Sequence, residues 1–250
     1  MQCKAIWKVL YASLVVTVVC GNLFAQKKIV VATDASWPPM ESLSSEKHIV
    51  GVDIDIMNAI AKAQRLDIEY RNVSWEAIFS TLQDGQADAI ISGVTILDSR
   101  TKTMDFSIPY LSMPQVIVVQ KKATGIVSMK DLHAKRIGLL KGSRSDRWFQ
   151  DTATSSKWIA VEYESTDPMF YNLIAGKVDA LIIDKVLAES WVKNPEDSNK
   201  IKIAGRTDLV ENYGIVVKKG NQRLLKAIND GITVIRNSGL LNTLTKTIMQ

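Results

Sequence analysis

The apolar positions of the chain recur at two spacings, and these predict strands that alternate with helices. Short apolar runs between polar residues are typical of buried strands, whereas apolar residues three and four positions apart are typical of one face of a helix. The runs predict strands over 28–33, 68–72, 89–91, 135–140, 158–163, 180–183, 201–204 and 213–217. The helical spacing predicts helices over 53–63, 75–82, 143–151, 185–192 and 222–236, another that begins at 166, and a short helix at the end.

Local signals mark the ends of several of these helices. Asp53 is placed to cap the helix over 53–63, and Asn221 is placed to cap the helix over 222–236. Gly85 ends the helix over 75–82, because glycine accepts the left-handed backbone that follows many helices. The polar segment 41–48 predicts a turn or hairpin.

One pattern of helix, glycine stop, turn and buried strand occurs twice. Six residues recur in register at a constant offset: Phe79, Leu82, Gly85, Asp88, Ala89 and Ile91 return as Phe170, Leu173, Gly176, Asp179, Ala180 and Ile182. The alternative is that any helix-to-strand connection of an α/β protein has this form. We interpret the repeat as the mark of two related lobes.

Strands that alternate with helices predict a parallel, doubly wound sheet in each lobe. In such sheets, ligands bind outside the carboxyl ends of the strands. Four polar segments follow directly after predicted strands, at 34–37, 92–100, 142–143 and 184. The sequence therefore predicts that these segments face one crevice.

The segment 92–100 has the parts of a carboxylate receptor. Ser92 and Gly93 allow a sharp turn or a close approach, Thr95 offers a hydroxyl, and Arg100 follows a polar turn at 98–99. A guanidinium binds a carboxylate through two parallel hydrogen bonds. The alternative is a surface arginine after a turn. In the segment 34–37, Trp37 is followed by two prolines, which favour an exposed loop over a core position.

Composition and charge exclude several function classes. The chain has 250 residues, 46% hydrophobic and 23% charged, which is typical of a globular protein. Its formal charge of +5 is spread among alternating acids and bases, so a nucleic-acid partner is not expected. The sequence holds no CxxC, no HExxH and no glycine-rich phosphate loop, and His48 and His133 are its only histidines. We therefore expect no metal and no cofactor.

The first 25 residues predict a signal peptide for export. Lys4 and Lys8 precede an apolar run over 9–19 that is too short to span a bilayer comfortably. Cleavage after Ala25 and lipidation at Cys20 are both open, although the valine before Cys20 is bulkier than lipidation patterns favour. Cys3 and Cys20 then lie outside the folded part, so the mature chain has no disulfide.

Several motifs, in their order and spacing, resemble one known family. They are ATDASWPP at 32–39, GVDIDIM at 51–57, GQADAIISGVTI at 85–96 and MDFSIPY at 104–110, with shorter matches at 130–132, 176–180 and 213–215. They resemble the polar amino-acid-binding proteins of bacterial ABC importers, the extracellular solute-binding family 3. The resemblance covers nearly all of the mature chain.

The resemblance implies an α/β fold of two doubly wound lobes joined by a two-strand hinge, as in type II periplasmic binding proteins. Lobe 1 would hold residues 26–110 and 214–250, and lobe 2 would hold 111–213, with crossings near 109–113 and 211–213. The lobes would close on a free amino acid and deliver it to the membrane permease of an ABC importer. The protein would act in the periplasm as a monomer, without catalysis.

The resemblance also implies roles for individual residues. Arg100 and Thr95, with backbone donors near Gly93 and Ser143, would hold the ligand's α-carboxylate. Asp184 and the main-chain carbonyl of Ser92 would hold its α-ammonium. The remaining candidates would surround the ligand side chain or border the site. The full set of candidate site residues is Asp34, Trp37, Trp75, Ser92, Gly93, Thr95, Arg100, Gly142, Ser143 and Asp184.

Trp37 and Trp75 would sandwich the ligand side chain, with Asp34 at its far end. A carboxylate and indole faces favour a cation, so arginine, lysine or histidine ranks first, an uncharged polar ligand such as glutamine second, and an acidic one third. Arg144 would favour an acidic ligand if it pointed inward. Arg144 and Met40 are two departures from the family pattern. Trp75 could instead be the first core residue of its helix, and Asp184 could cap the helix that follows it.

An enzyme on the same scaffold is the alternative function. The family resembles cyclohexadienyl dehydratases, which need a general acid in the cleft. Glu41, Glu164 and Asp167 are the acids near strand ends beyond the site carboxylates. A sensor domain is a third interpretation, but the chain contains no kinase portion.

Overall fold

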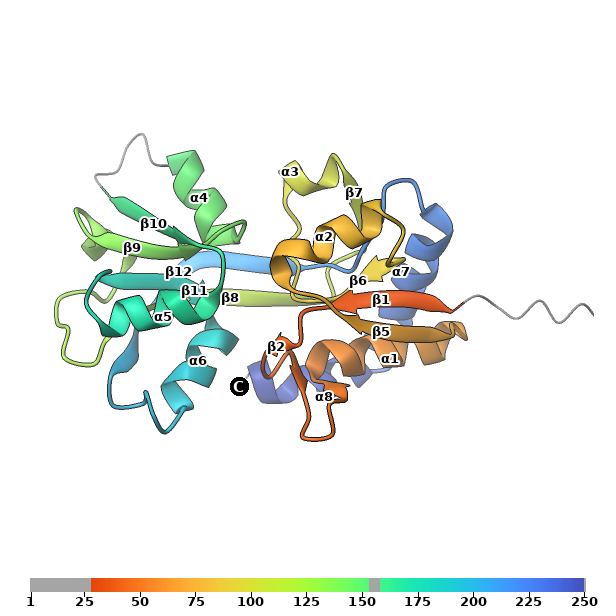
Figure 1. The fold of residues 1–250 in the computed structure, drawn as a ribbon, viewed down its shortest axis with the longest axis horizontal. Coiled ribbons are helices and arrows are strands. Elements are labelled where there is room, and N and C mark those ends of the chain that lie inside the picture. The colour runs from red at the N-terminus through yellow and green to blue at the C-terminus, as the bar shows by residue number, and fades with distance from the viewer. Residues whose placement is uncertain (1–27, 153–157, 250) are drawn as a thin grey trace, which may run out of the picture.

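The protein folds into two lobes that lie side by side and are joined by two long strands (Figure 1). The computed structural model describes residues 28–152 and 158–249, so the predicted signal peptide and Cys20 lie outside the described residues. The joining strands are β8 (Leu111–Gln120) and β12 (Ile201–Tyr213), which pair antiparallel. No helix within 28–152 or 158–249 has the length and apolar character needed to cross a membrane.

The first lobe is built on a five-stranded sheet with the order β5-β1-β6-β13-β7. Its strands are β1 (Ile29–Thr33), β5 (Ile68–Asn72), β6 (Ala89–Ile90), β7 (Met104–Phe106) and β13 (Val216–Lys218). Its helices are α1 (Val52–Gln64), α2 (Trp75–Gln83), α3 (Asp98–Thr101), α7 (Gln222–Asn237) and α8 (Leu240–Met249). A small sheet of β2 (Ser36–Trp37), β3 (Glu41–Leu43) and β4 (Ile49–Val50) adjoins it, which confirms the predicted hairpin.

The second lobe is built on a five-stranded sheet with the order β10-β9-β11-β8-β12. Its own strands are β9 (Arg136–Leu140), β10 (Ile159–Tyr163) and β11 (Ala180–Asp184). Its helices are α4 (Arg144–Thr152), α5 (Thr166–Ile174) and α6 (Lys185–Lys193), with a 3₁₀ turn at Met129–Leu132.

Apolar side chains cover both faces of each sheet, because successive strand residues point to opposite faces. In the first lobe, Val31 packs with α1 and α7, whereas its neighbour Ala32 packs with α2. In the second lobe, Val118 packs with α5 and α6, whereas Val119 lies in the cluster with α4 and the 3₁₀ turn. Both lobes are therefore doubly wound, as the sequence predicts.

Several features of the fold differ from the sequence-based predictions, which also lacked the strands β7 and β8. The sheets are mixed rather than parallel, because β13 and β8 run antiparallel to their neighbours. The predicted strands 201–204 and 213–217 were wrongly divided: β12 is continuous to Tyr213 with two register shifts, and β13 begins at Val216. The predicted turn at 98–99 is the start of the short helix α3. Polar residues and bulges interrupt the alternation of apolar positions along β12, so the sequence pattern did not predict it as one strand.

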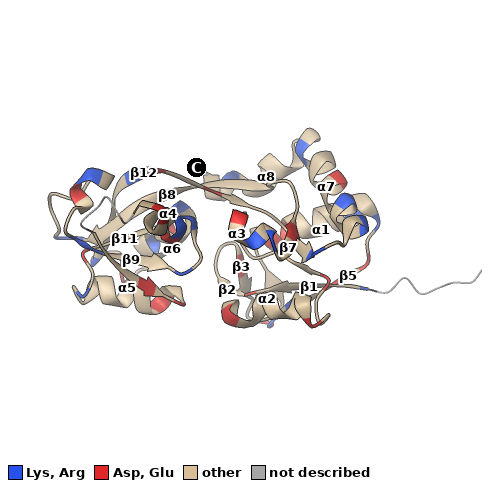
Figure 2. Cartoon of the chain, turned by 90° about the horizontal axis from the view of Figure 1, so that it is seen from above, with Lys and Arg blue, Asp and Glu red and all other residues tan. Residues whose placement is uncertain are grey.

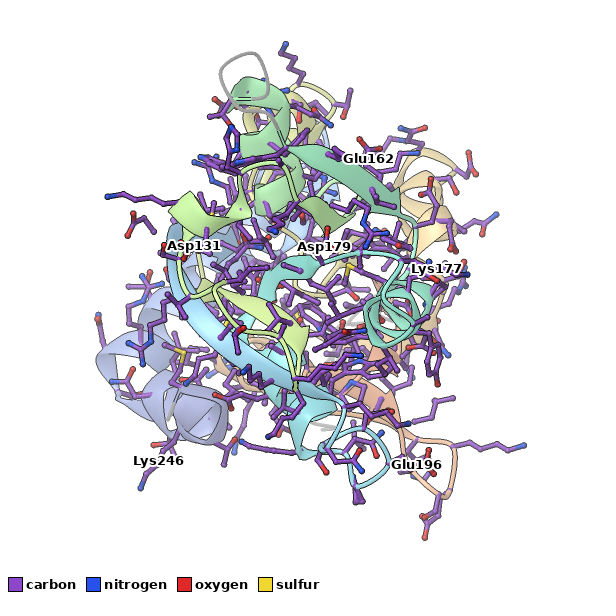
Figure 3. All side chains as sticks on the ribbon, turned by 90° about the vertical axis from the view of Figure 1, so that its left-hand side faces the viewer. Asp131, Glu162, Lys177, Asp179, Glu196 and Lys246 are labelled. Carbon is purple, nitrogen blue, oxygen red and sulfur yellow. The ribbon has the colours of Figure 1, made fainter. Side chains whose placement is uncertain are left out.

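Charged residues are interspersed over both lobes (Figure 2). At the outer end of the second lobe, the acidic Glu162 and Glu196 lie on the same exposed end as the basic Lys177 (Figure 3). This mixture indicates that the excess positive charge of the chain is spread over solvent-exposed surface. Trp191 stacks on Phe170 with ring centroids 4.1 Å apart, and Trp148 lies 4.8 Å from Trp158, so these tryptophans pack within their own lobe.

Candidate ligand-binding site

A cavity of about 330 Å³ lies between the lobes, at the carboxyl ends of strands from both sheets. Nine of the ten candidate residues line it: Asp34, Trp37, Trp75, Ser92, Gly93, Thr95, Gly142, Ser143 and Asp184. They come from loops after β1, β6 and β9, from β2, from the end of β11 and from the start of α2. The structure thus brings the four predicted segments to one place, and their role in ligand binding stays a prediction.

Arg100, the tenth candidate, lies at the border of the cavity. Its Nη1 donates to the main-chain oxygen of Thr95 at 3.2 Å, and its Cζ lies 5.7 Å from the ring of Trp75. A Cβ added at Gly142, in the second lobe, would lie 2.8 Å from its Nη2. The guanidinium therefore extends from α3 to the opposite lobe. Burial lowers the pKa of Arg100, while Glu211 and Asp146 oppose this change, and arginine stays charged.

Gly93 has a backbone conformation and a neighbour that only glycine accommodates. Its φ is +52°, and a Cβ at this position would lie 1.9 Å from Cζ3 of Trp37. The indole of Trp37 therefore lies directly against the Gly93 backbone. Trp37 also meets the ring of Tyr213 edge-on at 5.9 Å, so its position is fixed by packing against the linking strand β12.

Replacing Gly93 by alanine is expected to displace Trp37 and to weaken ligand binding. The added methyl group cannot share space with the indole, and overpacking of this kind costs about 1–3 kcal/mol. Tryptophan fluorescence and urea unfolding report the displacement. Gly125→Ala is the matched control, since Gly125 also has a positive φ, +81°, but an added Cβ there has no neighbour within 4 Å. Equal stabilities of the two variants would contradict the packing argument.

Asp34, predicted to face the far end of the ligand side chain, also makes a hydrogen bond within the protein. Its Oδ2 accepts a hydrogen bond from the backbone N–H of Trp75 at 2.8 Å, at the first residue of α2. Its own N–H donates to the hydroxyl of Ser92 at 3.0 Å. Asp34 therefore ties the β1 loop to α2 and positions Trp75 at the cavity, while Oδ1 remains available for a ligand.

Asp53 does not cap α1, so that prediction was wrong. Gly51 holds the N-cap position, and the buried carboxylate of Asp53 accepts hydrogen bonds from the N–H of Gly93 at 2.8 Å and from the hydroxyl of Tyr110 at 2.9 Å. The N–H of Gly93, one of the donors expected near the ligand carboxylate, is thus already satisfied inside the protein. Burial raises the pKa of Asp53 to about 6, although these hydrogen bonds oppose the change.

Glu41 is a cavity residue that the sequence reasoning did not assign to the ligand. It is fully buried, and the hydroxyl of Ser92 donates to its Oε1 at 2.6 Å. Its Oε2 accepts no hydrogen bond within the described residues. Burial, together with the nearby charge of Asp53, raises the pKa of Glu41 well above its usual value. Its place in a polar hairpin offered no signal for a buried position.

Asp184 ends β11 and precedes α6, but its side chain does not cap that helix. Its Oδ1 is buried and has no hydrogen-bond partner in the described part of the chain. Burial and the charge of Glu211 raise the pKa of Asp184 well above its usual value, although the side chains of Tyr213 and Gln115 lie close enough to oppose the change. A ligand ammonium would supply both the donor and the compensating charge that this oxygen lacks.

Glu211 is the second cavity residue that the sequence reasoning missed. It lies on β12, is 2% exposed, and accepts hydrogen bonds from the Thr95 hydroxyl, from Nε2 of Gln115 at 2.7 Å and from the N–H of Arg144 at 2.7 Å. The sequence indicated only that the chain crosses between lobes near this position.

The start of α4 forms the second-lobe wall of the cavity. Arg144 begins this helix, as predicted, and is half-buried. The Ser143 hydroxyl accepts from the N–H of Asp146 at 3.1 Å, and Asp146 in turn accepts from the N–H of Gly142 at 2.7 Å. Met40, the other departure from the family pattern, is fully buried in the core of the first lobe, where an apolar side chain of its size suffices.

The charges around the cavity are mostly negative. Arg100 lies at the border of the cavity, and Lys141 at the rim is paired with Glu164 at 2.7 Å. The charge of Arg144 lies close enough to Glu211 to oppose the rise in the pKa of that carboxyl. The acidic side chains on the lining are Asp34, Glu41, Glu76, Glu164, Asp184 and Glu211. A ligand that brings positive charge in addition to one carboxylate is therefore favoured by this site.

Two doubly wound lobes, joined by two strands and enclosing a polar cavity, define the class of two-lobed solute-binding proteins. The chain belongs to the bacterial extracellular solute-binding proteins, family 3, whose family model matches residues 29–250. This confirms the resemblance drawn from the motifs. The family comprises extracellular solute-binding proteins, and one relative is named as an arginine-binding protein of an ABC transporter.

Sequence similarity to named relatives and to solved structures supports this membership. The chain is 32% identical to a "probable histidine-binding protein" of Neisseria gonorrhoeae, over 84% of this chain and 78% of the relative. It is 29% identical to "ABC transporter arginine-binding protein 1" of Escherichia coli, over 86% and 88%. Among solved structures, an ancestral arginine-binding protein bound to arginine matches with a TM-score of 0.78 and 33% identity, over 89% of this chain and 98% of that chain.

Proposed function

We propose that this protein captures a free amino acid with a cationic side chain and delivers it to the permease of an ABC importer. The observation that carries the proposal is the charge arrangement of the cavity. One guanidinium, that of Arg100, lies beside Thr95, and buried carboxylates lie at two further positions, Asp184 and Glu41. An α-amino acid with a cationic side chain has the complementary set of charges.

The ligand's groups are assigned by this complementarity. Its α-carboxylate meets Arg100, and its α-ammonium meets the unpartnered Oδ1 of Asp184. Trp37 and Trp75 flank the apolar part of the side chain, and the distal cation faces Asp34 and Glu41. Glu41 is an addition to the predicted set, because its buried carboxyl group lines the cavity close to Asp34.

The names of the relatives support a cationic ligand. The relatives described above are named for histidine and arginine, and the solved ancestral protein is bound to arginine. Uncharged polar ligands such as glutamine rank second, because the Asp34 carboxylate also accepts from an amide. These names also support a binding role without catalysis.

The proposed function also assigns roles to the N-terminal segment and to the two lobes. Residues 1–25 direct export to the periplasm, with cleavage after Ala25 and lipidation at Cys20 as the two routes. Residues 26–110 and 214–250 form lobe 1, residues 111–213 form lobe 2, and the protein works as a monomer. The lobes rotate together on binding, so the radius of gyration measured by small-angle scattering decreases when ligand is added.

Thermal-shift screening of all twenty amino acids on refolded, ligand-free protein tests the ligand class. A ligand at a hundredfold excess over its Kd stabilises the protein by about 2.7 kcal/mol. Arginine, lysine or histidine should give the largest shift. If glutamate or a branched aliphatic amino acid gives the largest shift and arginine gives none, the assignment of the cation to Asp34 and Glu41 is wrong.

Replacing Asp34 by asparagine is expected to weaken arginine binding more than glutamine binding. The change removes a charge near the distal cation but keeps an acceptor for the N–H of Trp75. We expect a loss of about 1–2 kcal/mol for arginine, or about tenfold in affinity. Calorimetry with both ligands measures the difference, with the exposed Asp67→Asn as control. Equal losses for the two ligands would mean that Asp34 acts only through α2.

An enzyme of the cyclohexadienyl dehydratase type is the second candidate, and one observation favours it. Glu41 lines the cavity and its pKa is raised, as a general acid requires. Glu164 is exposed and paired with Lys141, and Asp167 is exposed, so neither meets that requirement. Mass spectrometry after incubation with a carboxylated cyclohexadienol distinguishes the two functions: a binding protein leaves the compound unchanged.

A further inference from the structure

The carboxylate of Glu211 contacts both lobes at once. Its Oε2 accepts from the hydroxyl of Thr95, in the loop after β6 of the first lobe. Its Oε1 accepts from the N–H of Arg144, the first residue of α4 in the second lobe, and from Nε2 of Gln115 on β8. One buried side chain on a linking strand thus joins the two walls of the cavity.

These donors are the ones expected for the ligand. Thr95 and the backbone near Ser143 were assigned to the α-carboxylate, and the N–H of Arg144 is the backbone donor that follows Ser143. The first N–H groups of a helix attract anions, and α4 presents one here. Glu211 therefore places a carboxylate on the hydrogen-bond donors that an amino acid's own carboxylate would use.

The two carboxylates cannot share these donors. A threonine hydroxyl and a backbone N–H each have one proton to donate. Two carboxylates this close also repel each other, because the site is buried. Three of the four acceptor sites of Glu211 are taken by Thr95, Gln115 and Arg144. Asp184 is therefore the better placed acceptor for the ligand ammonium, since its Oδ1 lies in no hydrogen bond of normal geometry within the described residues.

We propose that Glu211 is an internal competitor for the α-carboxylate of the ligand, and that it holds the two lobes together through the same donors. The proposal rests on the proposed amino-acid-binding function. Binding then exchanges one carboxylate for another at Thr95 and Arg144. The competition makes the affinity for an amino acid lower than it would be without Glu211. The same contacts hold part of the ligand-free population closed, so the decrease in the radius of gyration on binding is smaller in wild type than in Glu211→Ala.

Arginine and agmatine, which is arginine without its α-carboxylate, are the probes that test this competition. The variants are Glu211→Ala and the isosteric Glu211→Gln, with Glu162→Gln at the exposed end of the second lobe as the matched control. Each full-length protein is unfolded, freed of ligand and refolded, and its folding is checked by circular dichroism. Calorimetry measures both affinities, and small-angle scattering measures the radius of gyration without ligand.

Both Glu211 variants are expected to bind arginine at least tenfold more tightly than wild type does. Agmatine has no carboxylate to use the freed donors and loses one attracting charge, so it is expected to bind no more tightly than to wild type. Without ligand, Glu211→Ala is expected to have the larger radius of gyration. A fall or no change in arginine affinity, in either variant that folds, would overturn the proposal and leave Glu211 a residue that orients Thr95 and α4. If wild type binds no amino acid, the proposed function fails. The role of Glu211 in holding the lobes together is tested separately: it is overturned if Glu211→Ala and wild type have the same radius of gyration without ligand.

Discussion

Replacing Arg100 by lysine is expected to weaken amino-acid binding by about a hundredfold, or about 2–3 kcal/mol, although the charge is kept. A lysine ammonium cannot make the planar, two-pronged contact with a carboxylate. It would also lose the position that the guanidinium holds against the rings of Trp75 and Phe79, at 5.7 and 5.0 Å from Cζ. Calorimetry with arginine as ligand measures the loss.

Arg71→Lys is the matched control for this change. Arg71 is an exposed arginine of the same lobe, on β5, and its Nη1 donates to the main-chain oxygen of Gln86 at 2.7 Å. Its replacement should leave the affinity unchanged. An Arg100→Lys variant that binds within threefold of the control would remove Arg100 from the site.

The position of the cavity was predictable because it follows from local patterns. Short apolar runs located the strands, and the residues just past their carboxyl ends had to meet at one edge of each sheet. Asp34, Gly93 and Asp184, which belong to different strand ends, indeed line one cavity. The family resemblance added the role of each residue, which the pattern alone left open.

The carboxylates that occupy the donors of the site could not be found in this way. Gly93 and Asp53 are 40 residues apart, and Thr95 and Glu211 are 116 residues apart. Local periodicity carries no information on such pairs, and an acidic residue at a helix start is a normal cap. Asp53 was therefore interpreted as a cap, although the fold turns its carboxylate toward Gly93.

The linking strands β8 and β12 were not predicted as continuous strands for a related reason. β8 contains Pro114 and then a run, 116–119, that is buried on both faces, so it lacks the alternation of a half-buried strand. β12 pairs with it over most of its length, and that pairing, rather than its own sequence, makes it one strand.

Lowering the pH from 7 to 5 is expected to increase the free energy of unfolding of the ligand-free protein. The pKa values of Glu41, Asp53, Asp184 and Glu211 are all raised, mainly by burial. A carboxyl group with a raised pKa binds more protons in the folded than in the unfolded state, so its contribution to stability is lost as the pH rises through the folded pKa. For Asp53, with a pKa of about 6, the gain between pH 7 and 5 is about 1 kcal/mol.

Other carboxyl groups make the free energy of unfolding decrease as the pH falls, but they do so at lower pH. Asp179, hydrogen-bonded to Arg136, and Glu189, paired with Lys185 and Lys193, have lowered pKa values, although burial opposes the change at Glu189. Their contribution is present above the unfolded pKa, near 4, and is lost below it. The stability maximum is therefore expected near pH 5.

Affinity for arginine should change in the other direction, because protonation of Glu41 and Asp184 removes charges that attract the ligand. Urea unfolding and calorimetry at pH 5, 6 and 7 measure the two quantities on the same preparation. Asp53→Asn keeps one acceptor oxygen for Gly93 and Tyr110 but cannot titrate, so its unfolding free energy should depend less on pH than that of wild type or of the exposed control Asp67→Asn. An unfolding free energy that rises steadily from pH 5 to 7 in ligand-free wild type would show that the buried carboxylates do not dominate the stability of this protein.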